Sequence, residues 1–153
     1  MITIDERRID AAPEVAFQVA ADVERWPDIL PHYRWVRFQE RRGFGEGLVE
    51  MAAWRDFVGP ARYPTWWASD MTCDAHSRRI RYRHVAGVTR GMDVVWELDP
   101  DGAGTHARIV HEWDGPEWPL IGSVAANLVI GPHFISHIAG RTLAGVAAEA
   151  ERR

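Results

Sequence analysis

The stretch that decides the fold is residues 119–151, PLIGSVAANLVIGPHFISHIAGRTLAGVAAEAE. It predicts one long helix, because apolar or small residues recur close to the helical period at Val124, Leu128, Ile135, Ile138, Ala139, Thr142 and Val146. One face of this helix is therefore expected to lie on a core. Pro132, directly after Gly131, is expected to kink or restart the helix.

The second half of this helix is rich in Ala and Gly. Gly140 and Gly145 each cost roughly 1 kcal/mol relative to Ala inside a helix. A helix that needed only stability would avoid them. We therefore expect Gly140 to lie on the helix face toward a sheet, where its small size leaves room for close packing or for a ligand.

Length and composition restrict the class of protein. A chain of 153 residues fits one domain, residues 1–153, that is large enough to bury a core. With 18 basic and 22 acidic residues, it is a poor candidate for a general nucleic-acid binder or a polybasic membrane anchor. The lone Cys73 excludes a disulfide within the chain and suits a reducing compartment.

The start of the chain carries charges where a signal peptide would need an apolar run. No apolar window approaches the length of a membrane span. We expect a cytoplasmic protein without stable membrane insertion.

Upstream of the long helix, the pattern changes from helix to strand. Residues 1–9 predict a strand, residues 13–21 a helix, and residues 22–32 a second short helical segment punctuated by prolines. From Tyr33 onward, polar and apolar residues alternate, most clearly where Arg79, Arg81 and Arg83 alternate with Ile80, Tyr82 and His84. The order predicts an α+β domain whose helices lie on one side of a curled antiparallel sheet, with a cavity between the sheet and the last helix.

The chain resembles a known superfamily, the START-like helix-grip (SRPBCC) proteins. Three features carry the resemblance: residues 19–33, VAADVERWPDILPHY, the Gly104-Thr105 turn followed by Arg108, Val110, Glu112 and Asp114, and the long C-terminal helix. Within the superfamily it is most similar to polyketide cyclase/dehydratase proteins, which include bacterial aromatase/cyclases. It is also similar to the coenzyme-Q-binding proteins of this superfamily.

The resemblance implies a curved seven-stranded antiparallel sheet that wraps around the C-terminal helix, two short N-terminal helices, and an interior pocket for an apolar or polyketide ligand. It also implies pocket positions for Tyr33, Trp67 and Ser69. Met71 stands where the aromatase/cyclases carry an Arg that is proposed to polarise a ketone. Either another cation substitutes for that Arg, or the chemistry has changed.

Alternation along the strands indicates which residues could substitute for the Arg that Met71 replaces. If Val49, Met51 and Ala53 face inward, Arg55 does too, and an inward Arg needs a partner or an anionic ligand. The alternative is a bulge that turns Arg55 to solvent. His84 and His111 also fall on inward faces, where a His can act as a general acid or base or be an ordinary core residue.

The long helix adds His133 and His137, four residues apart, a spacing that allows two imidazoles to share a metal ion. No carboxylate or Cys follows at a matching interval, so we expect no metal. The resemblance implies a polar residue of the cavity wall near this point of the helix, and we place His137 there. The sequence shows no phosphate loop, no nucleophile elbow and no zinc signature. We expect no cofactor.

Aromatic and thioether side chains are the expected ligand contacts, since eight Trp are more than a core of this size usually needs. The candidates are Trp26, Met51, Trp67, Met71, Met92, Trp96 and Trp113. Core packing is the alternative for the aromatic residues. The stripe of Arg79, Arg81 and Arg83 is either a solvated face or a docking surface for an acidic acyl carrier protein.

Two functions follow from these residues. In the first, the protein is an enzyme that folds a reactive poly-β-ketone and promotes aldol cyclisation and dehydration, and its catalytic candidates are Tyr33, Ser69, Arg55, His84 and His111. In the second, it carries a quinone, lipid or other hydrophobic molecule without transforming it. Met71 favours the carrier, and the density of inward His and Trp favours the enzyme.

Overall fold

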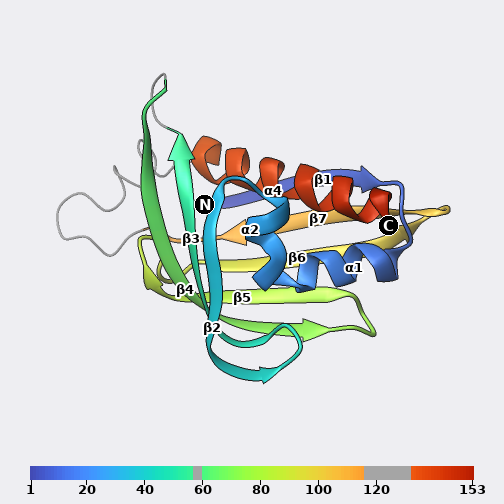
Figure 1. The fold of residues 1–153 in the computed structure, drawn as a ribbon, viewed down its shortest axis with the longest axis horizontal. Coiled ribbons are helices and arrows are strands. Elements are labelled where there is room, and N and C mark those ends of the chain that lie inside the picture. Colours follow the sequence, from blue (N-terminus) through green and yellow to red (C-terminus); the bar gives the residue numbers. More distant parts are fainter. Residues whose placement is uncertain (57–59, 116–131) are drawn as a thin grey trace.

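The computed structural model describes residues 1–56, 60–115 and 132–153, with the side chains of residues 132–134 also left out of the description. The chain begins with β1 (Ile2–Ile9), α1 (Pro13–Ala21), the short 3-10 helix η1 (Val23–Arg25) and α2 (Trp26–Ile29). Six further strands follow: β2 (Tyr33–Gly43), β3 (Glu46–Asp56), β4 (Arg62–Asp74), β5 (Arg79–Gly87), β6 (Asp93–Asp101) and β7 (Gly104–Glu112). The helix α4 (Pro132–Arg152) ends the chain (Figure 1).

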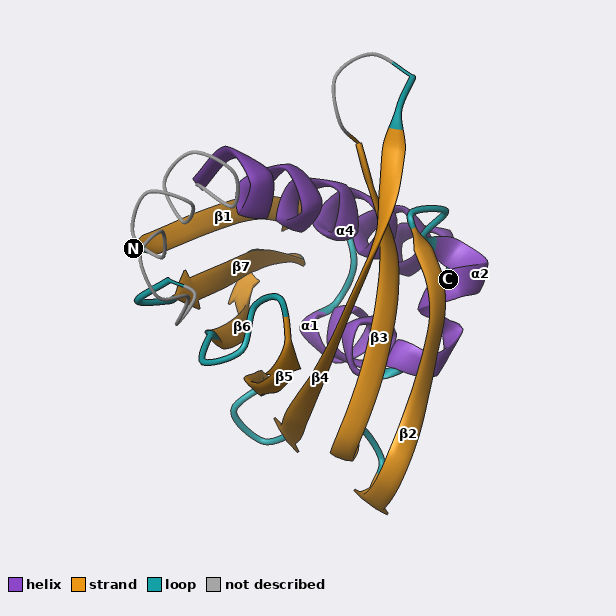
Figure 2. Ribbon diagram, turned by 90° about the vertical axis from the view of Figure 1, so that its left-hand side faces the viewer, coloured by secondary structure: helices purple, strands orange, loops and turns teal. Residues whose placement is uncertain are grey.

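The seven strands form one antiparallel sheet in the order β1-β7-β6-β5-β4-β3-β2. Figure 2 shows this sheet curving around α4, with α1 and α2 on the same inner side. The expected α+β architecture, a curved seven-stranded sheet that wraps around a C-terminal helix with two short helices near the start of the chain, is confirmed. None of the helices in the described ranges is long and apolar enough to cross a membrane.

The strand pattern on β5 shows how the sequence sets the two faces of the sheet. Ile80, Tyr82 and His84 are buried, while the arginines between them face outward. Arg79 binds Asp99 at 3.0 Å, and Arg83 binds Asp93. Neighbouring carboxylates on β6 therefore offset two of the three cations of the predicted stripe.

The helix α4 begins at Pro132, where the sequence predicted a break, and residues 119–131 of the predicted helix lie outside the described ranges. Its buried face contains Ile135, Ala139, Thr142, Leu143 and Val146. A helix turns by about 100° per residue, so this face leaves Gly140 on the solvent side.

The expectation that Gly140 faces the sheet is therefore wrong: nothing would lie within 4 Å of a Cβ atom added to it. Gly145 is instead the glycine that permits close packing. A Cβ atom there would come within 2.0 Å of Leu30 Cδ2, next to the end of α2.

Replacement by Ala is expected to have opposite effects on stability at the two glycines. Gly140→Ala should raise the free energy of unfolding by roughly 1 kcal/mol, because the helix gains propensity in open space. Gly145→Ala gains the same propensity but forces Leu30 to move, and overpacking typically costs about 1 to 3 kcal/mol. Urea denaturation should therefore place Gly145→Ala below Gly140→Ala by about that amount. Equal stability of the two variants would mean that α4 does not pack on Leu30 in this way.

Candidate functional site

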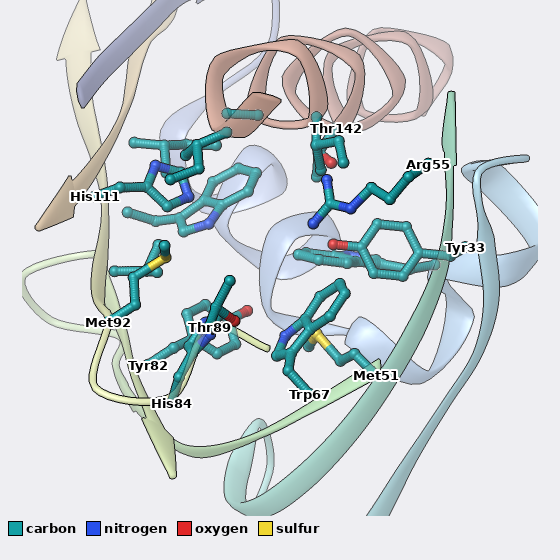
Figure 3. Close-up of a pocket in the computed structure, with 17 residues that line it drawn as sticks. Tyr33, Met51, Arg55, Trp67, Tyr82, His84, Thr89, Met92, His111 and Thr142 are labelled. Carbon is teal, nitrogen blue, oxygen red and sulfur yellow. Dashed lines mark hydrogen bonds between the residues drawn. The ribbon is translucent and has the colours of Figure 1, made fainter. Parts of the chain in front are cut away.

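A cavity lies between the inner face of the sheet, α2 and α4 (Figure 3). Its volume is about 70 Å³, which is smaller than the few hundred Å³ that drug-sized ligand pockets usually have and that we expected. Large side chains project into this space (Figure 3). The lining residues are Trp26, Tyr33, Met51, Arg55, Trp67, Tyr82, His84, Thr89, Met92, Val94, Trp96, Ile109, His111, Ile135, Ile138, Ala139 and Thr142.

Aromatic rings form a continuous wall of this cavity. The ring centroid of Trp26 lies 5.2 Å from that of Tyr33 and 5.9 Å from that of Trp96. Tyr33 continues to Trp67 at 6.1 Å, and Trp67 stacks on His84 at 6.0 Å with an interplanar angle of 8°. Such a wall suits flat, unsaturated ligands, because offset and edge contacts between rings are favourable.

Arg55 reaches the cavity from β3, so it faces inward and is not turned to solvent by a bulge. Its Nε donates to Thr65 Oγ1 at 3.3 Å, and the Thr65 hydroxyl donates to the Ala53 carbonyl at 3.0 Å. Its guanidinium carbon lies 5.7 Å from the centre of the Trp67 ring. Burial lowers the pKa of Arg55 to about 10, so the group remains protonated at neutral pH.

The charge of this cavity has one sign. Of the described residues that line it, Arg55 is the only one that is charged at neutral pH, and none is a carboxylate. A buried cation in such a lining favours a negatively charged or strongly polarised oxygen on a ligand.

Two histidines occupy other parts of the wall, and both are neutral at pH 7. Burial, assisted by the charges of His111 and Arg55, lowers the pKa of His84 to about 3, and its Nδ1 lies 2.6 Å from Thr89 Oγ1. Burial and then Arg55 lower the pKa of His111 to about 4. Among the described residues, His111 Nδ1 has no hydrogen-bond partner, so this nitrogen can take part in binding a ligand.

Two tyrosine hydroxyls complete the polar groups of the cavity. Burial raises the pKa of Tyr33 to about 12, although Arg55 and the Thr142 side chain oppose the rise. Burial also raises the pKa of Tyr82 well above its usual value. Within the described part of the chain, the Tyr82 hydroxyl has no hydrogen-bond partner. Both groups are therefore neutral donors at physiological pH.

The structure places four of the sequence candidates outside the cavity. Ser69 faces inward opposite His84 but does not line the space. Met71 is fully buried and pairs with Gly47, at the opposite end of the β3–β4 ladder from the pair of Arg55 with Tyr63. Near Met71 the β2–β3 turn meets the end of α1, because a Cβ on Gly45 would contact Ala21.

Trp113 and His137 are the other two candidates that lie outside the cavity. The Trp113 ring donates from Nε1 to the Arg90 carbonyl at 3.0 Å, which ties it to the β5–β6 turn. His137 was expected in the cavity wall, and this is wrong: its side chain is 56% exposed and lies 3.6 Å from Asp56. About 200° of helix rotation separates it from Ile135, which faces inward. The side chain of its possible metal-binding partner, His133, lies outside the described residues.

Other polar lining residues were missed by the sequence analysis as site residues. Tyr82 and Thr142 were already placed on inward faces by periodicity, so the signal was present and only their chemical role was overlooked. Thr89 lies in the β5–β6 turn, and alternation says nothing about a turn. No group of three or more His, Cys, Asp or Glu side chains that could hold a metal occurs among the described residues.

A curved antiparallel sheet around a C-terminal helix defines a helix-grip fold, and in this chain an aromatic cavity lies between the sheet and the helix. Residues 9–129 match the family described as polyketide cyclase / dehydrase and lipid transport. The chain belongs to this family. No curated protein is similar enough in sequence to match.

Solved structures share the whole fold at low sequence identity. The Zhui aromatase/cyclase from Streptomyces sp. R1128 is 23% identical with a TM-score of 0.80, covering 100% of this chain and 94% of its own. The TTHA0849 protein of Thermus thermophilus is 19% identical with a TM-score of 0.78, over 98% and 97% of the two chains. The major latex-like protein 151 of Panax ginseng is 12% identical with a TM-score of 0.76, over 98% and 97%.

Proposed function

We propose that the protein binds a poly-β-ketone or a related aromatic intermediate in the cavity and promotes its aldol cyclisation and dehydration. The observation that carries the proposal is the placement of Arg55, a protonated guanidinium, in an aromatic cavity whose other described lining residues are uncharged at neutral pH. Aldol closure develops negative charge on an enolate oxygen. A preorganised cation in a site that excludes water stabilises such charge strongly.

The polar groups stand on opposite sides of the ligand space. Figure 3 shows Arg55 and Tyr33 on one side and His111 on the other. We assign the enolate oxygen to Arg55 and Tyr33, which are both donors. We assign removal of the α-proton to His111, whose Nδ1 has no protein partner within the described ranges. The Trp67 and Trp96 rings would hold the chain in the conformation that closes.

The low pKa of His111 makes it a weak base in the empty cavity, since general bases work best when their pKa is close to the working pH. Part of that lowering comes from Arg55. The negative charge that develops on the enolate oxygen beside Arg55 would offset the positive field and raise the pKa of His111. The base would therefore become stronger as the proton is removed.

The test compares product profiles, because poly-β-ketones also close without a protein. Wild type should give a narrow set of products, and His111→Ala or Tyr33→Phe should lower the rate of directed closure by about 10² to 10⁴ while ligand binding persists. Replacement of the exposed His76 by Ala is the matched control and should leave the profile unchanged.

One observation favours a different function. Both histidines of the cavity are weak bases, and a carrier of a quinone or lipid needs no base. If wild type and all variants give the same mixture as the substrate alone, the protein is a carrier and the enzyme assignment is wrong.

A further inference from the structure

Thr65 is a buried threonine to which the proposed chemistry gives no role. It lies on β4, is 9% exposed, and does not line the cavity. In the antiparallel ladder it stands directly opposite Ala53 of β3. Alternation places it on the same face of β4 as Trp67, which does line the cavity. Thr65 therefore belongs to the inner face of the sheet, next to the ligand space.

The hydroxyl of Thr65 makes two hydrogen bonds with different roles. It donates its proton to the Ala53 carbonyl at 3.0 Å. A hydroxyl has a single proton, so toward any other group this oxygen can only accept. It accepts from Arg55 Nε at 3.3 Å. The Ala53 carbonyl thus sets the direction of the oxygen lone pairs, and a lone pair holds the guanidinium.

The register of β3 and β4 shows in which direction this bond holds Arg55. Arg55 stands opposite Tyr63, two residues nearer the end of β3 than the Ala53–Thr65 pair. Trp67 lies two residues beyond that pair in the other direction. The guanidinium carbon of Arg55 is 5.7 Å from the centre of the Trp67 ring. The side chain therefore runs back from the end of β3, past Thr65, toward the aromatic wall of the cavity.

Without this bond, the cation would have reason to leave the cavity. Burial of a charged group is costly, and a carboxylate stands at the end of β3 in contact with solvent. This is Asp56, which binds Arg141 at 3.1 Å and lies 3.6 Å from His137. A guanidinium released from Thr65 would be drawn toward this carboxylate and water. The hydrogen bond to Thr65 opposes that movement.

We propose that Thr65 is the positioning residue of Arg55: its hydroxyl, oriented by the Ala53 carbonyl, holds the guanidinium at the cavity where the negative oxygen of the ligand binds. The Nε–H bond lies in the plane of the guanidinium, so the bond to Thr65 also restricts how that plane is turned. A cation that is already in place needs no reorganisation when the enolate forms. This assignment rests on the proposed function, in which Arg55 stabilises the enolate oxygen.

The first test compares two variants at position 65. Thr65→Val keeps the branched shape and removes the hydroxyl, so directed closure at saturating substrate should slow by about 10-fold to 100-fold, with a much smaller change in KM. Thr65→Ser restores the hydroxyl and should recover the larger part of the lost rate. Thr72→Val, at an exposed position of the same strand, is the control and should behave like the wild type.

The second test separates positioning from a loss of stability. Thr65→Val also takes a donor away from the Ala53 carbonyl, and a loosened β3 would slow closure too. If Thr65 acts through Arg55, Thr65→Val should reduce the rate no further in an Arg55→Met background, because the group that it positions is gone. Losses that multiply in the double variant would mean that Thr65 acts by another route, and this overturns the proposal.

The third test needs no substrate. In ¹⁵N-labelled protein, the Arg55 Nε–H resonance is the one that Arg55→Met removes. In the wild type this proton should exchange slowly with water and show a nuclear Overhauser effect to the Thr65 side chain, because it is buried and hydrogen-bonded. Thr65→Val should shift the resonance and speed the exchange, and Thr65→Ser should keep both close to the wild-type values. A wild-type resonance without contact to Thr65 overturns the proposal even if no variant at position 65 folds.

The outcomes separate the positioning role from the proposed function. If wild type directs closure and Thr65→Val matches it, the positioning role is overturned and the proposed function stands. If wild type gives the same products as the substrate alone, the proposed function fails, and with it the role of Thr65 in catalysis.

Discussion

Replacement of Arg55 by Met should reduce the rate of directed ring closure by about 10² to 10³, the loss typical of removing one donor that stabilises an oxyanion. Met has a similar length and suits the neighbouring Trp67 ring, so we expect the fold to persist. The variant should also raise the pKa values of His84 and His111, because Arg55 lowers both. NMR titration of the two imidazoles measures this second effect without any substrate.

The matched control is Arg81→Met, which removes an exposed Arg from the outer face of β5. It should change neither the product profile nor the two titrations. If Arg55→Met directs closure as well as wild type while the histidine titrations shift as expected, Arg55 faces the site but does not stabilise the enolate.

Mild acid should destabilise the protein strongly between about pH 6.5 and pH 4. The pKa values of His84 and His111 fall from 6.5 to about 3 and about 4 on folding. In this window the unfolded chain binds protons that the folded chain does not, so stability is complete above pH 6.5 and is lost as the pH falls. Each histidine contributes up to about 1.4 kcal/mol per pH unit. Together they remove roughly 4 kcal/mol by pH 5, a large share of a typical total of about 5 to 15 kcal/mol.

Urea denaturation at a series of pH values measures this dependence. His111→Gln should make the slope shallower by about 1.4 kcal/mol per pH unit within the window. Substitution of the exposed His76 by Gln should leave the slope unchanged. A wild-type slope that His111→Gln does not alter would show that His111 is already accessible to protons in the folded state.

The fold was predictable because two local patterns agree with each other. The first is the alternation of Arg79, Arg81 and Arg83 with inward residues, which identifies a strand with one solvent-exposed face. The second is the helical spacing of Ile135, Ala139, Thr142 and Val146, which marks one buried helix face. These patterns follow directly from the periods of the strand and the helix. The pairing of β1 with β7, by contrast, was not predicted, because alternation does not say which strands are neighbours.

The candidate site was predictable wherever a residue lay inside a regular strand. Alternation alone placed Arg55, His84 and His111 inward. His137 failed because analogy with the family was preferred to the helical period, which put it on the solvent side. Thr89 lies in a connection between elements, where the direction of a side chain depends on tertiary packing rather than on a local pattern.

The position of Arg55 on the sheet bears on which bond a cyclase of this kind would form. The resemblance implies a cation at the position of Met71, yet Met71 and Arg55 stand at opposite ends of the β3–β4 ladder. A poly-β-ketone carries a carbonyl at every second carbon, and the carbonyl nearest the cation is the most polarised. Moving the cation along the strands therefore changes which carbonyl is activated, even when the fold and the aromatic walls stay the same. The regiochemistry of closure would then be set by the strand that carries the arginine.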